Sequence, residues 1–230
     1  MQFKHPIYAV IVAGGQGTRM GNAIPKQFLE IGGKSILYYT INAFLEALHE
    51  VHLVLVLPQQ QISYGQMVLQ SFSERIEITI VAGGSTRFQS VKNGLALVPE
   101  DAIVLVHDGV RPLISKELIF RCIHQAEEYG SAVPAIAVAD SMRVIQNEQS
   151  KPIDRNALRI IQTPQTFKSS ILVPAFQQEF KEIFTDEATV VEAYGRTIYL
   201  VEGERNNIKI TTPEDMVIVE AIIKEKRKKV

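Results

Sequence analysis

Short apolar runs alternate with helical patterns through the first 138 residues, and this alternation constrains the fold more than any other feature. Residues 51–57 are almost wholly apolar and are closed by Pro58, which is typical of a parallel strand covered on both faces. Strands that alternate with helices form right-handed βαβ units around a mostly parallel sheet. The sequence therefore predicts an α/β fold, a Rossmann-like three-layer sandwich with a mostly parallel mixed sheet. Strands are expected at 9–12, 51–57, 76–82, 102–108 and 132–138, and helices at 35–48, 59–73, 88–97 and 115–130.

The pattern changes between residues 139 and 167, where core-type residues become sparse. Residues 141–145 resemble a strand, 146–151 a polar turn, and 153–162 a returning segment. We interpret this stretch as a β-arm that projects from a single domain spanning residues 1–230. An arm that cannot bury its own faces often packs on a partner subunit, although a floppy insertion is the alternative. After the arm, helices are expected at 169–184 and 186–194, a strand at 197–201, and a last helix from Pro213.

The first predicted strand runs into a glycine-rich loop that also carries two cations. Glycine lets another group approach the backbone closely, and successive N–H groups that point into one concavity bind anions. The loop lacks both the P-loop spacing and the third glycine of a dinucleotide-binding loop, so a structural turn with incidental cations is the alternative. We predict that it binds a triphosphate, whose charge the two cations would neutralise. The residues concerned are Ala13, Gly14, Gly15, Gly17, Arg19 and Lys26.

Two more polar loops follow predicted strands, at residues 83–87 and 107–111. The carboxyl ends of parallel strands meet at one edge of the sheet, so the three loops are expected to form one site. Asp108 would be repelled by a triphosphate unless a cation intervenes, which makes it a plausible Mg²⁺ ligand; a cap for the turn is the alternative. His107 points to the opposite face of an extended strand and is expected to be structural.

Composition excludes several classes of partner. Hydrophobic residues make up 46% of the chain and charged residues 21%, as in ordinary soluble domains, and the net charge of −1 gives no general attraction to nucleic acid. The beginning of the sequence shows no signal-peptide pattern, and no apolar run is long enough to cross a bilayer. Cys122 is the one cysteine and is expected to be a packing residue in a reducing compartment. We expect a cytoplasmic protein without nucleic-acid or membrane partners.

The chemistry that the sequence favours is transfer rather than acid–base hydrolysis. We find no Ser-His-Asp order, no metal-ligand cluster of His and Cys, and no obvious carboxylate pair. Phosphoryl or nucleotidyl transfer to an acceptor that is already ionised needs positioning and charge stabilisation. The cations available for this are Arg19, Lys26, Arg111, Arg155 and Lys209.

Five separated motifs together resemble a known family. Residues 12–20 with 25–27 resemble the nucleotidyltransferases that activate sugars and polyols. The further motifs at 107–112, 154–156, 163–165 and 207–209 make the chain similar to the 2-C-methyl-D-erythritol 4-phosphate cytidylyltransferase family of the non-mevalonate isoprenoid pathway. The resemblance runs in order over nearly the full chain.

The resemblance implies that the phosphate of methylerythritol phosphate attacks the α-phosphorus of CTP, with Mg²⁺ as cofactor and pyrophosphate as the leaving group. It also implies a homodimer whose arms cross, so that Arg155 serves the neighbouring site. The implied catalytic residues are Arg19, Lys26, Arg155 and Lys209. The implied nucleotide-binding residues are Ala13, Gly14, Gly15, Gly17, Gly84, Ser85 and Ser90. The implied substrate-binding residues are Asp108, Arg111, Ser141, Arg155, Thr163 and Lys209, with Asp108 also on the metal side.

Three positions depart from the family pattern: Ser85, Ser141 and Asn206 stand where Asp, Thr and Asp are more usual. The related ribitol-5-phosphate cytidylyltransferases share the CTP half, and the motif at 154–156 favours methylerythritol phosphate as the acceptor. A non-catalytic nucleotide-binding module is a second alternative. A dinucleotide-binding dehydrogenase is disfavoured, because residues 57–59 offer no acid at the end of the second strand.

Overall fold

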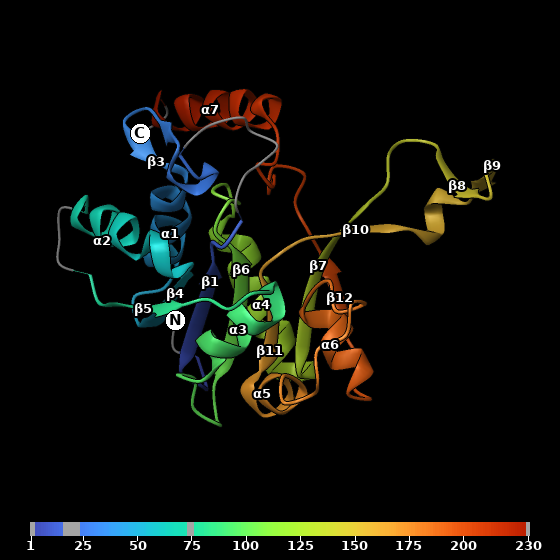
Figure 1. The fold of residues 1–230 in the computed structure, drawn as a ribbon, viewed down its shortest axis with the longest axis horizontal. Coiled ribbons are helices and arrows are strands. Elements are labelled where there is room, and N and C mark those ends of the chain that lie inside the picture. Colours follow the sequence, from blue (N-terminus) through green and yellow to red (C-terminus); the bar gives the residue numbers. More distant parts are fainter. Residues whose placement is uncertain (1–2, 16–23, 73–75, 229–230) are drawn as a thin grey trace.

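A mixed sheet of eight strands forms the centre of the computed structural model, which describes residues 3–15, 24–72 and 76–228 (Figure 1). Its strands are β1 (Ile7–Val12), β4 (Val51–Leu57), β5 (Ile78–Ala82), β6 (Ile103–Asp108), β7 (Ser131–Ala137), β10 (Arg159–Ile161), β11 (Gln165–Lys168) and β12 (Leu200–Glu202). The order is β10-β7-β11-β6-β1-β4-β5, with β12 beside β7. β6, β1, β4 and β5 are mutually parallel, whereas β11 pairs antiparallel with β6 and β7. The predicted mostly parallel mixed sheet is confirmed.

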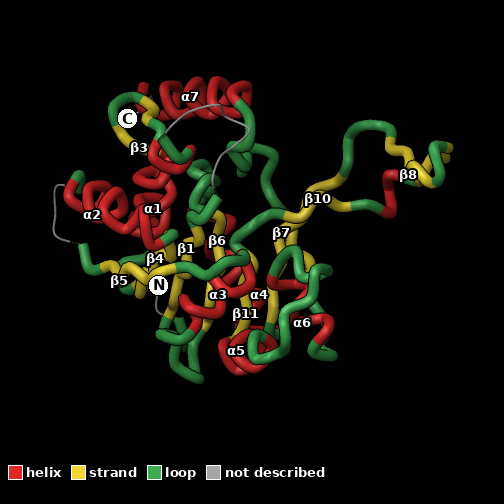
Figure 2. The backbone as a smooth tube through the Cα atoms, in the orientation of Figure 1, coloured by secondary structure: helices red, strands yellow, loops and turns green. Residues whose placement is uncertain are grey.

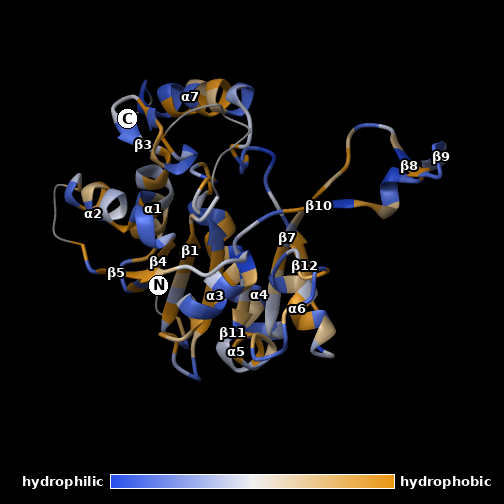
Figure 3. Cartoon of the chain, in the orientation of Figure 1, coloured by the Kyte–Doolittle hydropathy of each residue, from blue (hydrophilic) through white to orange (hydrophobic). Residues whose placement is uncertain are grey.

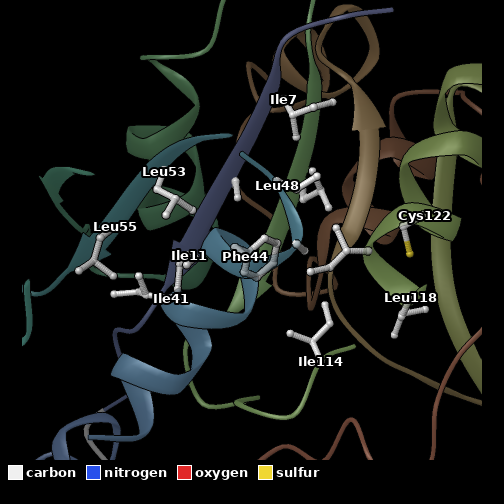
Figure 4. Packing of buried hydrophobic residues seen from close by; sticks show 14 of the residues in the cluster. Ile7, Ile11, Ile41, Phe44, Leu48, Leu53, Leu55, Ile114, Leu118 and Cys122 are labelled. Atoms are coloured by element: carbon white, nitrogen blue, oxygen red, sulfur yellow. The ribbon is translucent and has the colours of Figure 1, made fainter. Parts of the chain in front are cut away.

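Helices cover both faces of the sheet, as Figure 2 shows in red on either side of the yellow strands. The alternation of side chains along β1 sends Ile11 to one face and Val10 to the other. Ile11 packs in a cluster with Leu55 of β4 and Phe44, and Figure 4 shows Ile11 and Phe44 side by side at the centre of the view, with Leu55 to their left. The helices of this face are α1 (Ile36–Ala47), α2 (Ile62–Gln70) and α4 (Lys116–Tyr129), and those of the other face are α3 (Arg87–Leu95), α5 (Ser169–Ala175) and α6 (Glu187–Ala193).

A smaller layer lies beyond the carboxyl end of the sheet and is built on the last helix, α7 (Pro213–Lys228). Val219 and Ile223 of α7 pack with Ile210 in a third apolar cluster, which fixes the segment before the helix close to the end of β6. The short elements of this region are η2 (Lys26–Phe28), β2 (Glu30–Ile31), β3 (Lys34–Ser35) and η3 (Gln59–Gln61). None of the described helices is long and apolar enough to cross a membrane.

The arm is a two-stranded hairpin of β8 (Met142–Gln146) and β9 (Gln149–Ile153), followed by η4 (Arg155–Ala157). It extends away from the sheet in Figure 1, and Figure 3 shows hydrophilic residues through much of it, in contrast to the apolar β1. The polar turn that the sequence predicted at 146–151 was wrong. The turn consists only of Asn147 and Glu148, both at positive φ (47° and 63°), and β9 begins at the next residue. A two-residue turn of this kind matches the twist of the two strands, so no longer loop is needed.

Two predicted boundaries after the arm were also wrong. The helix expected to reach residue 184 ends at Ala175, because Phe176, Phe180 and Phe184 leave the helical path and gather around the ring of Phe88. The strand expected at 197–201 is β12, which begins only at residue 200. The helix expected at 186–194 is confirmed as α6, with an Asp186 N-cap and Gly195 at a φ of 82° just after its end.

Cys122 lies on the core-facing side of α4 and is fully buried, as predicted, and burial raises the pKa of its thiol to about 12. A thiol is reactive only as the thiolate, so the native protein has almost no reactive form at neutral pH. We expect a colorimetric disulfide reagent to label native Cys122 at least about 100-fold more slowly than the protein unfolded in guanidinium. Labelling at equal rates would show that the helix opens readily in solution.

Candidate active site

The three predicted loops meet at the carboxyl edge of the sheet, where they line a cavity of about 360 Å³. One loop follows β1, one follows β5, and one follows β6, and the segment before α7 closes the fourth side. Ligands bind at this edge in open α/β sheets, so the convergence that the sequence predicted is confirmed. The predicted site residues that line the cavity are Ala13, Gly14, Gly15, Lys26, Gly84, Ser85, Ser90, Asp108 and Lys209.

The loop after β5 is fixed by its own hydrogen bonds. The backbone N–H of Gly83 donates to the carbonyl of Leu57 at 2.8 Å, and the N–H of Gly84 donates to Ser90 Oγ at 3.1 Å. A Cβ at Gly84 would lie 2.5 Å from the Cβ of Gln89, so this position admits only glycine without a rearrangement. Ser90 therefore holds the loop against the start of α3, and the backbone of the loop stays open toward the cavity.

Lys26 and Gln27 anchor η2 to the far side of the cavity. Lys26 Nζ donates to the carbonyl of Ile210 at 2.9 Å. The amide of Gln27 is fully buried and donates to the carbonyl of Ala13 at 2.8 Å, which ties η2 to the loop after β1. Of the other predicted residues in this loop, Gly17 and Arg19 lie outside the described residues.

Asp108 ends β6 and is nearly buried among three cations. Lys209 Nζ is 2.9 Å from Asp108 Oδ2, Arg111 Nε is 3.6 Å from the same oxygen, and Arg87 Nη2 is 3.4 Å from Oδ1. Burial alone would raise the pKa of Asp108, but Arg87, Lys209 and Arg111 outweigh it and hold the pKa well below its usual range. Asp108 is therefore ionised throughout the physiological range.

His107 and Thr163 lie behind Asp108 and fix its backbone. The N–H of Asp108 donates to Thr163 Oγ1 at 3.1 Å, and Thr163 Oγ1 is 3.0 Å from His107 Nδ1. Burial lowers the pKa of His107 to about 4, so the ring is neutral. We infer that its Nε2 donates to the carbonyl of Arg111, 3.1 Å away, and that its Nδ1 accepts the Thr163 hydroxyl. This agrees with the structural role expected of His107, and it makes Thr163 a support for Asp108.

Ser141 and Arg155 do not reach the cavity of their own chain. Both are exposed on the arm, and the guanidinium of Arg155 donates to the carbonyl of Ala139. Arg111 lies beside the cavity rather than in its lining, with Nη1 donating to the carbonyl of Asn207 at 2.8 Å. The structure thus brings together the two cavity-lining lysines and Asp108, and it leaves the arm residues apart.

Sequence reasoning missed an ion pair beside Asp108. Arg87, which lines the cavity, contacts both carboxylate oxygens of Glu187 at 2.5 and 3.1 Å, and Glu187 is fully buried. The only signal was that Arg87 ends the polar loop after β5. Glu187 carries no local signal, because it looks like an ordinary acid in the first turn of a helix.

The residues around Asp108 do not fit a metal ion bound directly to the protein. Asp108 is the only acid among the described residues that line the cavity, and its oxygens face Arg87, Arg111 and Lys209. The described residues also contain no group of three His, Cys, Asp or Glu arranged to hold a metal. Mg²⁺ is usually held by one or two carboxylates together with phosphate oxygens, so three cations on one carboxylate oppose the predicted metal role of Asp108.

The cavity lies at the carboxyl edge of the parallel strands and combines backbone loops suited to phosphates with two lysines and an ionised aspartate. This site and fold define the class of the protein as a nucleotidyltransferase. Comparison with known families narrows this. The family model described as 2-C-methyl-D-erythritol 4-phosphate cytidylyltransferase matches residues 7–225. The chain belongs to that family of CTP-dependent enzymes of isoprenoid biosynthesis.

Individual relatives agree with the family. The 2-C-methyl-D-erythritol 4-phosphate cytidylyltransferase of Phocaeicola vulgatus is 45% identical over 94% of this chain and 99% of its own length. The enzyme of the same name from Bacteroides fragilis is 46% identical over 94% and 98%, respectively. Among solved structures, 4-diphosphocytidyl-2C-methyl-D-erythritol synthase from Anaerococcus prevotii superimposes with a TM-score of 0.80 at 28% identity, covering 96% of this chain and 99% of that one. Fold and sequence therefore point to the same family.

Proposed function

We propose that this cavity transfers the cytidylyl group of CTP to 2-C-methyl-D-erythritol 4-phosphate, with the two lysines on opposite sides of the reacting phosphorus. The observation that carries the proposal is that the segment before α7 brings the two lysines together: it contains Lys209, and its next residue, Ile210, binds Lys26. Lys26 Nζ bonds the carbonyl of Ile210, and the adjacent Lys209 bonds Asp108 across the cavity. The nucleotide then lies along Gly14, Gly15 and the loop of Gly84, and the acceptor phosphate lies beside Lys209.

In this reaction an oxygen of the acceptor phosphate forms a bond to the α-phosphorus of CTP, and the bond from that phosphorus to the pyrophosphate oxygen breaks. The acceptor phosphate is already ionised, so no proton has to be removed from it. Lys26 stabilises the charge on the five-coordinate phosphorus together with Arg19, whose role is predicted from the sequence, and Lys209 holds the attacking phosphate in line. Pyrophosphate leaves, and the products are 4-diphosphocytidyl-2-C-methyl-D-erythritol and pyrophosphate.

We propose Mg²⁺ as the cofactor and the triphosphate as its carrier. The donors around Asp108 do not fit the ion, whereas phosphate oxygens and water are the ligands that Mg²⁺ prefers. We also propose a cytoplasmic location, which is supported by the single cysteine, buried and free, as expected in a reducing compartment.

The acceptor is tested by the release of pyrophosphate from CTP and Mg²⁺. We expect release only when methylerythritol phosphate is added, and little or none with ribitol 5-phosphate at the same concentration. Preference for ribitol 5-phosphate would move the chain to the related activity. Binding of CTP without turnover on either acceptor would favour a nucleotide-binding module instead.

We further propose that residues 1–230 form one nucleotidyltransferase domain whose arm, at about 139–167, crosses a homodimer to complete the neighbouring site. The arm exposes apolar side chains such as Val144, Ile145 and Ile160, which a second copy would cover. Arg155 lies on the same arm, outside its own cavity. An arginine that holds a phosphate there would therefore act on the partner's acceptor.

Mixed dimers test the crossing of the arm. Arg155→Ala and Lys26→Ala subunits are each expected to be nearly inactive alone. If the arm crosses, one site of each mixed dimer has both residues intact, and random pairing restores roughly one quarter of the wild-type rate. Pyrophosphate release after co-refolding is the measurement. Arg143→Ala, which removes another exposed arginine of the arm, is the control and should stay active alone. Absence of recovery would contradict the crossing.

A further inference from the structure

Arg87 lies between the loop that follows β5 and Asp108, but its guanidinium is fixed by a third residue, Glu187. It makes two short contacts with Glu187, at 2.5 and 3.1 Å, and one long contact of 3.4 Å with Asp108 Oδ1. Paired parallel hydrogen bonds to one carboxylate fix both the position and the plane of a guanidinium. The orientation of Arg87 is therefore set by Glu187, and Asp108 receives a cation that is already in place.

Glu187 is in turn held against the same edge of the sheet. Gln165 of β11 donates to Asp186 Oδ2 at 2.9 Å and accepts the N–H of Ala188 at 2.7 Å, so it holds the residues on both sides of Glu187. Gln165 pairs with Val106 of β6, two residues before Asp108. Glu187 has no exposed surface, so it cannot touch a substrate, and its carboxylate is available only to Arg87.

The other two cations at Asp108 are placed differently. Lys209 contacts only one oxygen of Asp108, Oδ2, and its side chain lines the cavity and is 44% exposed. Arg111 approaches the same oxygen at 3.6 Å and directs Nη1 to the carbonyl of Asn207. An incoming phosphate can attract Lys209 away from Asp108, because Lys209 makes one contact with the carboxylate, is exposed, and has a flexible side chain.

We propose that Arg87 and Glu187 are positioning residues that keep Asp108 charge-compensated while Lys209 turns to the acceptor phosphate. Arg87 stays on Oδ1 when Lys209 leaves Oδ2, so the substrate phosphate does not meet an isolated carboxylate. This rests on the proposed acceptor side of the site, at Lys209 and Asp108. It assigns to a buried glutamate, one hundred residues from Arg87, a share in the affinity for the acceptor.

A double-mutant cycle separates this role from a contact that only supports the fold. The variants are Arg87→Met, Glu187→Gln and the two combined, with the KM of each substrate, kcat and the unfolding temperature measured for all. We expect each variant to raise the KM for methylerythritol phosphate about 10-fold or more and to change the KM for CTP less than about threefold. The combined variant leaves no charge buried alone, so its unfolding temperature should return toward the wild type while its acceptor KM stays raised.

Recovery of the acceptor KM in the combined variant would overturn the proposal, because the pair would then serve only the fold. An equal rise in the KM for CTP would also overturn it, by placing Arg87 on the nucleotide. If either single variant does not fold, Arg87→Lys keeps the charge without the paired geometry and is expected to show a smaller rise in the same KM. The half-buried pair of Arg121 and Glu204, outside the cavity, changed to Met and Gln, is the control. Wild-type turnover with methylerythritol phosphate is measured first, so a failure of the proposed function would be seen separately.

Discussion

Replacing Lys26 with alanine is expected to lower kcat by about 10²–10³-fold while changing the dissociation constant for CTP only a few-fold. Lys26 Nζ is held on the carbonyl of Ile210, and Lys26 lines the cavity. In the transfer proposed above, its charge would act on the phosphorus as negative charge builds up in the transition state. A group that binds the transition state more strongly than the ground state affects turnover rather than affinity. Pyrophosphate release under saturating substrates and calorimetric titration with CTP measure the two quantities.

Lys34→Ala is a suitable control for this result. Lys34 is also a lysine near η2, but it donates to the carbonyl of Ser71 and lies over the ring of Tyr38, away from the cavity. Its removal should leave kcat within about twofold of the wild type, since it alters no contact in the site. Losses of equal size in kcat and in CTP affinity for Lys26→Ala would refute a role in the transition state.

Asp108→Asn is expected to lower both stability and activity. The change leaves Arg87, Arg111 and Lys209 facing an uncharged group. Breaking buried pairs of this kind costs about 3 kcal/mol here, near the lower end of the usual range because Lys209 and Arg87 keep some contact with solvent. The expected fall in Tm is roughly 6–12 °C, and kcat/KM for the acceptor should fall about 100-fold. Thermal unfolding followed by circular dichroism and initial rates measure these effects.

The pH dependence of this difference gives an independent check. Because Asp108 has a lowered pKa in the folded state, it contributes stability above its unfolded pKa of about 4, and the contribution is lost as the pH falls further. The gap in Tm between the wild type and Asp108→Asn should be full at pH 7 and shrink between about pH 4 and pH 3. Asp101→Asn, at an exposed aspartate paired with His5, should show almost no gap at pH 7. A gap that is constant across this range would mean that the lost charge is not its cause.

The order of elements and the place of the site were predictable because they depend on local patterns. Runs such as that of β4 are apolar enough to be buried on both faces, and the loops after β1, β5 and β6 then fall at one edge whatever the side-chain packing. The limits of elements beyond the arm were not predictable. The end of α5 is decided by the three phenylalanines that collect around Phe88, a contact across more than 80 residues of sequence.

The electrostatics of the site depend on tertiary contacts in the same way. The sequence predicts a metal ligand at Asp108 because it shows an acid beside a predicted triphosphate site. What surrounds it comes from α3, from the turn after β6 and from the segment before α7, which only the folded chain brings together. A pattern along the chain indicates which residues are polar, but not which charges are neighbours.

The root of the arm has a consequence for how proteins of this kind diversify. The chain leaves the sheet at the end of β7 and returns as β10, which pairs with β7, with Ala137 opposite Arg159 and Ala135 opposite Ile161. These pairs close the root independently of the length or composition of the hairpin beyond it. Insertions or deletions at Asn147 and Glu148 can thus accumulate without displacing Thr163 from the backbone of Asp108. The hairpin of the arm and the loops around the cavity are in this sense separate units of evolutionary change.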